Sequence, residues 1–205
     1  MEEFIKKMVY TSFRRAWEED RGGPPPSPHE VYVTEVTQCL LKSWFQRTMG
    51  EKPDGEKAVV LVLGDDVHFL MRDYFPIGDG EVTAERELEN GVKLRGRVDR
   101  LLEETIIEFK TVSRAPDKPL SHHVDQVQLY MWLFGRLNAH IVYVTKTNGE
   151  VRVFKVDRDE ERIKELLERA KRLSDSLKSG KPPDPEPGWL CKYCEFTSIC
   201  KGSTS

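Results

Sequence analysis

The stretches Gly96-Arg97-Val98-Asp99 and Ile107-Glu108-Phe109-Lys110 lie on either side of a predicted tight turn at Glu103-Glu104. The apolar and β-branched residues that flank this turn are typical of two antiparallel strands. With a two-residue loop, Asp99 and Glu108 become direct cross-strand neighbours, with Cβ atoms about 5 Å apart. Lys110 falls on the same face as Glu108, because side chains alternate along a strand. The two stretches therefore predict a hairpin that presents two acids and one amine on a single patch.

Two carboxylates and an amine in one place are suited to metal-assisted hydrolysis of a phosphodiester. Acids this close repel each other unless a cation or a shared proton lies between them, so we expect a divalent metal. Asp99 and Glu108 supply oxygen ligands, the backbone carbonyl of Phe109 adds another, and Lys110 can contact the phosphate or the attacking water. His68 adds a nitrogen ligand, which favours manganese or another transition ion over magnesium. From spacing alone, the alternative is a solvated cross-strand pair beside an ordinary helical histidine.

Composition limits the class of protein. The chain has 205 residues, which suits one compact domain with a small appendage. Its mean hydropathy is -0.56, and it has no apolar run near the roughly 20 residues that span a bilayer. No signal peptide is expected after Met1-Glu2-Glu3, so we expect no membrane association and a cytoplasmic location. The net charge of -3 gives no global attraction to nucleic acid, and the high Glu, Lys and Arg content leans toward a thermophilic source.

Apolar periodicity predicts an N-terminal helix with a Pro-rich linker (1–30) and a mixed α/β domain (31–205). The prolines of residues 22–28 favour an extended linker. Asn90-Gly91 and Asn148-Gly149 are typical of hairpin turns. The order of elements predicts a central mixed sheet flanked by helices. Helices are expected over 2–20, 34–49 (with Thr34 as N-cap and Cys39 in its second turn), 57–74 (containing His68), 121–135 and from 157 or 159 to 179, and strands over 82–88, 92–102, 105–111, 140–145 and 150–156.

Four motifs, taken in order, resemble the RecB-type branch of the PD-(D/E)xK nucleases. The elements of that family are a helix histidine, a G-x-x-D strand, an E-x-K strand and a Q-x-x-x-Y helix. The resemblance implies a restriction-endonuclease-like α/β core. Here the motifs are His68, Gly96-Arg97-Val98-Asp99, Glu108-Phe109-Lys110 and Gln126-Val127-Gln128-Leu129-Tyr130.

The resemblance also implies a role for each matching residue. Gln126 and Tyr130 lie four positions apart on one helix face and can act together. Taken alone, Tyr130 is equally well explained as a core aromatic. The family's roles are metal binding for His68, Asp99 and Glu108, the hydrolytic step for Lys110, and positioning of the DNA strand for Gln126 and Tyr130.

Three of the four cysteines, Cys191, Cys194 and Cys200, crowd the C-terminus, whereas Cys39 is far away in sequence. Disulfides and structural zinc are alternatives, although zinc more often uses two local ligand pairs. The pattern resembles the iron-sulfur staple of some RecB-type nucleases, which implies a cluster held by all four thiolates. The expected iron-sulfur region consists of Cys39 and residues 189–200, and it joins the N-terminal helical part to the chain's end. A 4Fe-4S cluster is the family default, and a 2Fe-2S cluster takes the same number of ligands. Trp189, Tyr193 and Phe196 are expected to form its apolar shell.

A chain of this size without a helicase most resembles the CRISPR-associated RecB-like exonuclease family. The resemblance implies a metal-dependent exonuclease, with Mn²⁺ or Mg²⁺, that cuts single-stranded DNA from 5′ to 3′. It also implies trimming of spacer precursors for the spacer-integration complex. Arg95, Arg97, Arg100 and Arg114 are near enough in sequence to guide a strand. The alternatives are a noncatalytic nucleic-acid-binding or adaptor module with a zinc or redox-sensing cysteine site, and a RecB-type nuclease of general DNA repair.

Overall fold

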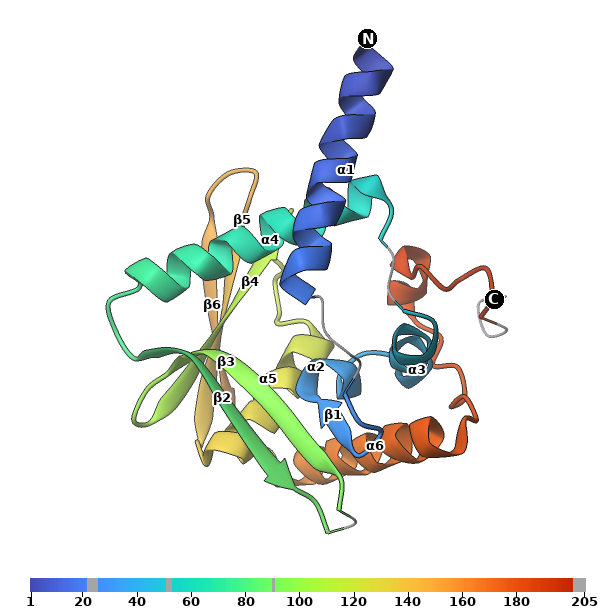
Figure 1. Ribbon diagram of the computed structural model, residues 1–205. Helices are drawn as coiled ribbons and strands as arrows, with labels where there is room; N and C mark the ends of the chain where they lie inside the picture. The colour runs from blue at the N-terminus through green and yellow to red at the C-terminus, as the bar shows by residue number, and fades with distance from the viewer. Residues whose placement is uncertain (22–25, 51–52, 90, 201–205) are drawn as a thin grey trace.

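The computed structural model describes residues 1–21, 26–50, 53–89 and 91–200 (Figure 1). Within these residues, six strands form one mixed sheet in the order β1-β3-β4-β5-β6, with β2 paired to β3. The β1–β3 and β4–β5 pairs are parallel, and the others are antiparallel. The strands are β1 (Glu30–Tyr32), β2 (Asp79–Glu87), β3 (Lys93–Leu101), β4 (Thr105–Val112), β5 (Asn138–Thr145) and β6 (Val151–Asp157).

Helices cover both faces of the sheet. The main core lies between the sheet, α5 and α6, where Ile106, Leu129 and Leu173 are fully buried. Phe109 points to the opposite face from Ile106, because side chains alternate along β4, and there it packs edge-on against Phe75 at the end of α4. The helical elements are α1 (Glu2–Arg21), α2 (Val33–Val36), α3 (Leu40–Met49), α4 (Gly55–Tyr74), α5 (Ser121–Phe134), α6 (Glu160–Ser179) and the 3-10 helix η1 (Trp189–Tyr193).

Most of the predicted elements are present, and the mixed sheet flanked by helices is confirmed. The helix predicted over 34–49 is wrong in its continuity and in its N-cap, which is Tyr32 rather than Thr34, and one short strand was not predicted. The single helix expected over 34–49 is divided into α2 and α3, and Cys39 is the N-cap of α3 rather than a residue of a second turn. Glu30–Tyr32 forms the short strand β1, which pairs with the start of β3. Three residues carry too short a pattern to identify a strand without its partner.

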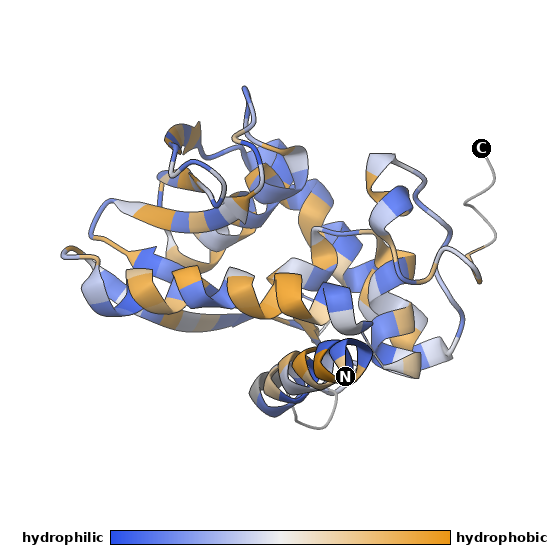
Figure 2. Cartoon of the chain, turned by 90° about the horizontal axis from the view of Figure 1, so that it is seen from above, coloured by the Kyte–Doolittle hydropathy of each residue, from blue (hydrophilic) through white to orange (hydrophobic). Residues whose placement is uncertain are grey.

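The helix α1 lies against the start of α4 and extends away from the sheet (Figure 1). The Tyr10 hydroxyl donates to Glu56 at 3.3 Å, and a Cβ on Gly55 would lie 2.5 Å from the Tyr10 ring. Viewed from above, apolar residues mark both α1 and α4 (Figure 2), and Phe4 and Val60 are among those exposed. Residues 22–25 of the expected linker and Asn90 of the expected turn lie outside the described residues, and the division at residue 30 stays a prediction. None of the described helices combines the length and apolarity needed to cross a bilayer.

Candidate active site and cysteine cavity

Strand β3 changes its pairing at Asp99. The hairpin register is as predicted, with Leu101 opposite Ile106 and Arg100 opposite Ile107. The ladder between β3 and β4 ends there, so the expected Asp99–Glu108 ladder pair is not formed. On the other side of β3, the ladder with β2 passes from Gly80–Arg100 to Val82–Val98, and Glu81 between them has a φ of 51°. Such a φ is uncommon for a residue other than glycine and costs about 1–2 kcal/mol.

The Asp99 carboxylate occupies the opening that the end of the ladder leaves. Its Oδ2 accepts a 2.7 Å hydrogen bond from the Phe109 backbone N–H, which would otherwise lack a strand partner. Its Oδ1 lies 3.0 Å from Nδ1 of His68 on α4. The hydrogen bond to Asp99 raises the pKa of His68, although burial acts in the opposite direction. The break in the sheet thus fixes Asp99 and orients the histidine.

Glu108 is the most deeply buried acid of the group, with only 3% of its surface exposed. Its Oε1 accepts hydrogen bonds from Lys110 Nζ at 2.8 Å and from Gln126 Nε2 at 3.0 Å. Its Oε2 is buried without a hydrogen-bond partner among the described residues. Burial and the nearby Asp99 charge raise the pKa of Glu108 to about 7, against the opposing effect of Lys110. An unsatisfied buried carboxylate oxygen is costly, and a bound cation would satisfy it.

Helix α5 brings Gln126 and Tyr130 to the same place. Gln126 Nε2 also lies 2.8 Å from the Tyr130 hydroxyl, and both side chains are buried. Burial raises the pKa of Tyr130 well above its ordinary value. The Tyr130 ring packs closely against β3, since a Cβ on Gly96 would lie 2.8 Å from it. Tyr130 is therefore both a core aromatic and a residue of the site, and Gly96 of the G-x-x-D motif allows its close approach.

One cavity of about 940 Å³ is lined by all the predicted side chains of this group: His68, Asp99, Glu108, Lys110, Gln126 and Tyr130. Of the arginines considered for strand guidance, Arg95 and Arg97 also line the cavity. Arg100 does not, because it is buried and donates to the backbone carbonyls of Met71 and Arg72 in the last turn of α4 and of Gly78 just before β2. Arg114 is exposed and lies elsewhere. The arginine predictions thus separate into two that line the cavity and two that do not.

Sequence reasoning missed Asp65, Arg72 and Glu81, which line the same cavity. Asp65 and Arg72 lie three residues before and four residues after His68, so helical periodicity could have suggested both. Glu81 carries no such signal, because its position depends on the unusual backbone of β2.

The metal prediction fits the donor set. Asp99, Glu108 and His68 offer oxygen and nitrogen donors around one cavity, and Glu108 has an unsatisfied buried oxygen. In the part of the chain that the structure describes, no three His, Cys, Asp or Glu side chains are arranged as a preformed metal site. Glu108 and Asp99 are instead held by Lys110, Gln126 and the Phe109 backbone.

The four cysteines line a second cavity, of about 650 Å³. No disulfide forms among them in the described chain. Burial raises the pKa of the Cys194 thiol, and Cys39 is close enough to add to the effect. Of the aromatic residues expected to shield the thiols, only Phe196 is buried, whereas Trp189 and Tyr193 are more than half exposed. All three aromatic residues line the cysteine cavity, so the apolar shell stays a prediction, with Trp189 and Tyr193 more open to solvent than expected.

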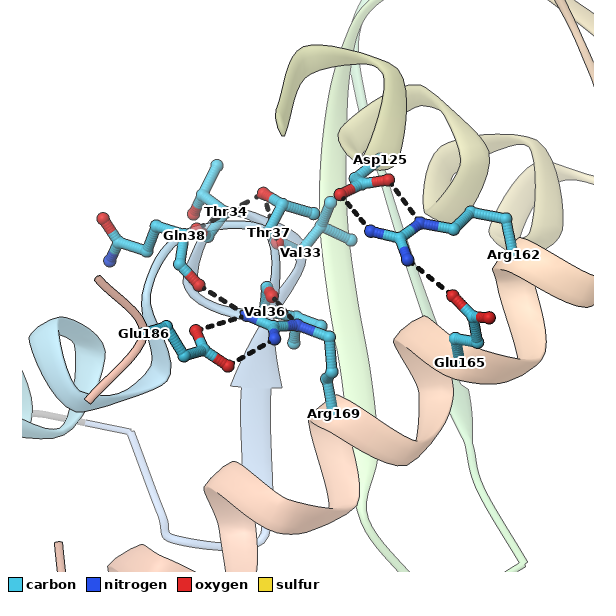
Figure 3. A network of polar contacts seen from close by, with 10 residues as sticks. All are labelled: Val33, Thr34, Val36, Thr37, Gln38, Asp125, Arg162, Glu165, Arg169 and Glu186. Atoms are coloured by element: carbon cyan, nitrogen blue, oxygen red, sulfur yellow. Dashed lines mark hydrogen bonds and ion pairs between the residues drawn. The ribbon is translucent and has the colours of Figure 1, made fainter. Parts of the chain in front are cut away.

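An ionic junction explains why the helix breaks at Cys39 (Figure 3). Arg169 on α6 donates to the backbone carbonyls of Val36 and Gln38, at 3.1 and 2.8 Å, where α2 ends. The same guanidinium binds both carboxylate oxygens of Glu186. Glu186 Oε2 then accepts from the Leu40 backbone N–H at 3.1 Å and so caps α3. The junction satisfies the backbone on both sides of Cys39 and ties it to the loop that precedes Cys191.

A second ionic group on α6 lies nearby. Arg162 donates to both oxygens of Asp125 on α5 at 2.7 Å (Figure 3). Asp125, Arg162 and Arg169 all line the cysteine cavity. The cavity is therefore bounded by charged side chains on one side and by the cysteine segment on the other.

Comparison with known proteins identifies the family. A model described as the PD-(D/E)XK nuclease superfamily matches residues 11–201. The chain belongs to this superfamily and is a DNA nuclease.

Individual relatives indicate which branch of the superfamily the chain resembles. CRISPR-associated exonuclease Cas4 of Saccharolobus solfataricus is 29% identical over 183 residues, which are 83% of this chain and 86% of the relative. The crystal structure of SSO0001 matches with a TM-score of 0.74 and 25% identity over 98% of each chain. The resemblance to the CRISPR-associated RecB-like nucleases is thereby confirmed. An alkaline exonuclease from Laribacter hongkongensis shares the fold, with a TM-score of 0.54 and 14% identity over 83% of this chain and 94% of its own.

Proposed function

We propose that this protein is a metal-dependent exonuclease that degrades single-stranded DNA from 5′ to 3′ and trims spacer precursors for the CRISPR spacer-integration complex in the cytoplasm. One observation carries the nuclease chemistry: His68, Asp99, Glu108 and Lys110 line one cavity, in which a buried Glu108 oxygen lacks a partner. Cas4, to which the chain is similar, is named as a CRISPR-associated exonuclease, and this name supports the exonuclease part of the proposal.

The side chains of the cavity are suited to different roles, metal binding for some and positioning for others. His68, Asp99, Glu108 and the Phe109 carbonyl would hold Mn²⁺ or Mg²⁺, with the His68 nitrogen favouring manganese. When bound, the divalent ion supplies Lewis acidity toward the scissile phosphate and acidifies water. The Phe109 N–H fixes Asp99. Gln126 hydrogen-bonds both Glu108 and the Tyr130 hydroxyl. Through these bonds Gln126 and Tyr130 would position the DNA strand relative to Glu108.

Lys110 supplies the positive charge for the hydrolytic step. Its Nζ lies 2.8 Å from Glu108 Oε1, and 17% of its side chain is exposed toward the cavity. From there it can hold the attacking water by a hydrogen bond and offset the charge that develops on the phosphate oxygens. The bond from phosphorus to the water oxygen forms as the bond to the leaving strand oxygen breaks; the attacking water gives up one proton and the leaving oxygen takes up one.

We also propose that Cys39, Cys191, Cys194 and Cys200 bind an iron-sulfur cluster, 4Fe-4S rather than 2Fe-2S. Four thiols around one cavity, none of them in a disulfide with another, support this assignment. The cluster would have a structural role, because the nuclease residues require no electron. It would hold the segment after α6 against the start of α3.

Two measurements on one anaerobic preparation test the proposal. An absorbance spectrum with iron quantification tests the cluster, and a manganese-dependent assay on 5′- and 3′-labelled single-stranded DNA tests the activity and its polarity. We expect a brown protein that cleaves DNA only with added metal. Metal-independent cleavage, or none with any divalent ion, would contradict the enzymatic assignment, and a colourless protein without iron would contradict the cluster.

The noncatalytic alternative predicts DNA binding without metal-dependent cleavage. The intact set of acids, lysine and histidine around the cavity counts against it. A role in general DNA repair keeps the same chemistry and differs in the substrate. Comparing cleavage of spacer-precursor duplexes with single-stranded overhangs against cleavage of nicked or gapped repair substrates would separate the two.

A further inference from the structure

Two arginines from different elements face one acid in the active-site cavity. Glu81 of β2 lies 3.7 Å from Arg72 of α4 and 3.8 Å from Arg97 of β3, through separate carboxylate oxygens. All three residues line the cavity that contains Lys110. Glu81 therefore joins two cations beside the reacting groups.

These two ion pairs are weak by their geometry. Both separations exceed hydrogen-bond length, and 64% of the Arg97 side chain is exposed. In the described chain, the Arg97 side chain makes no hydrogen bond. Long-range pairs between partly exposed side chains contribute little to stability. The N–H groups of Arg97 thus remain available for a better acceptor.

Arg72 is held in place on its other sides. Its guanidinium lies 4.8 Å from the centre of the Phe69 ring, and its Nε donates to Asp73 at 2.7 Å. The buried Arg100 binds the Arg72 carbonyl and so fixes the end of α4. Arg72 is therefore already oriented, and an anion that binds it loses little side-chain entropy.

The strained backbone of Glu81 gives the second, independent observation. Its φ of 51° interrupts an otherwise regular ladder between β2 and β3. Residues in such conformations concentrate at functional sites. A carboxylate kept between two cations at this cost, without a hydrogen bond to either, is suited to leave them when a stronger acceptor arrives.

We propose that Arg72 and Arg97 form a clamp for one backbone phosphate of the substrate strand, and that Glu81 occupies this clamp in the absence of DNA. A phosphodiester accepts paired guanidinium N–H groups better than a distant carboxylate does. The clamp lies in the same cavity as Lys110, so it would hold a phosphate near the scissile one and set how the strand enters. This inference rests on the proposed function, because it takes single-stranded DNA as the ligand.

Binding without cleavage tests the clamp. Fluorescence anisotropy with a labelled single-stranded oligodeoxythymidine, in EDTA and over a series of salt concentrations, gives Kd and its salt slope. We expect Arg97→Ala and Arg72→Ala each to weaken binding and to reduce the salt slope by about 0.7, the value for one phosphate contact on a single strand. Arg97→Lys should keep the slope, because a point charge still pairs with the phosphate.

The decisive variant is Glu81→Gln, which removes the competing charge at nearly the same shape. We expect Kd to fall by about threefold to tenfold, the effect of losing two exposed ion pairs. The gain should disappear when Arg72 and Arg97 are both alanine. Glu85→Gln is the matched control, since Glu85 is an exposed acid on the same strand that pairs with Lys93 instead, and it should change Kd less than about twofold.

The outcomes separate the two proposals. Equal effects of Glu81→Gln and Glu85→Gln, or a gain that persists without the arginines, would overturn the clamp even in a protein that cleaves DNA. A protein that never cleaves but shows the expected binding pattern would retain the clamp and lose the enzymatic function. Thermal unfolding of each variant tests whether its fold is intact, so that a change in Kd is not mistaken for unfolding.

Discussion

Gly96→Ala should destabilise the protein and slow its chemistry together. An added Cβ would lie 2.8 Å from Tyr130, 2.9 Å from Leu133 and 2.9 Å from Val33. These contacts come from α5 and α2, so no single rotation relieves all of them. Overpacking of this kind costs about 1–3 kcal/mol. For a chain of this length, a loss of 2 kcal/mol lowers Tm by roughly 4–8 °C.

The effect on activity follows from the ring that must move. Tyr130 shares a hydrogen bond with Gln126, and Gln126 holds Glu108. Displacing the Tyr130 ring therefore shifts Glu108 through Gln126, although the substitution does not contact Glu108 directly. We expect kcat for single-stranded DNA to fall, while Kd measured in EDTA changes little.

Gly64→Ala on α4 is the matched control. Its added Cβ would meet Thr111 at 3.6 Å, an ordinary contact, and alanine inside a helix is favoured over glycine by about 0.5–1 kcal/mol. Urea unfolding of both variants should give changes of opposite sign. A Gly96→Ala protein as stable and active as the wild type would refute the close packing of Tyr130 against β3. So would two variants that shift in the same direction by the same amount.

Three further predictions concern the other parts of the site. Lys110→Ala should lower kcat by about 100-fold or more, while Lys118→Ala, an exposed lysine away from the cavity, should leave it unchanged; equal rates would remove Lys110 from the hydrolytic step. Glu186→Gln should destabilise the protein at pH 7: burial alone would raise the pKa of Glu186, but Arg169 and the Leu40 N–H together lower it. Its stabilising contribution is thus present above the ordinary carboxyl pKa and is lost as pH falls through the lowered value. In urea unfolding, the difference in free energy of unfolding between variant and wild type should therefore shrink in acid. A difference that does not change with pH would argue against the ionic junction. Cys39→Ser should reduce the iron content of anaerobically purified protein and lower its Tm, and full iron occupancy in this variant would exclude Cys39 as a ligand.

Local sequence patterns predicted parts of the candidate site. Asp99, Glu108 and Lys110 lie within a dozen residues and follow one hairpin, whose register a two-residue turn determines. Gln126 and Tyr130 are one helical turn apart. Periodicity and turn length predict these local groups, whereas the resemblance to the RecB-type nucleases predicted that His68, the hairpin and the helix with Gln126 and Tyr130 share one site.

The features that sequence did not predict depend on distant partners. The division of the helix at Cys39 requires Arg169 and Glu186, whose contacts with Val36 and Leu40 span 133 and 146 residues of sequence. The early end of the β3–β4 ladder has no local signal, because the Asp99 side chain replaces a backbone acceptor. Periodicity indicates the secondary structure that a segment favours on its own, whereas these tertiary contacts determine where its helices and strands end.

The ionic junction at Cys39 also has a consequence for synthesis of the chain. The Leu40 amide and Glu186 are separated by 146 residues. At elongation rates of about 5–20 residues per second, the ribosome needs roughly 7–30 s to make that segment. Throughout this interval α3 lacks its acceptor and Cys39 lacks the other three cysteines. The cysteine cavity therefore cannot close before the ribosome has made the C-terminal cysteines, and only a chain translated through its final cysteine can complete it.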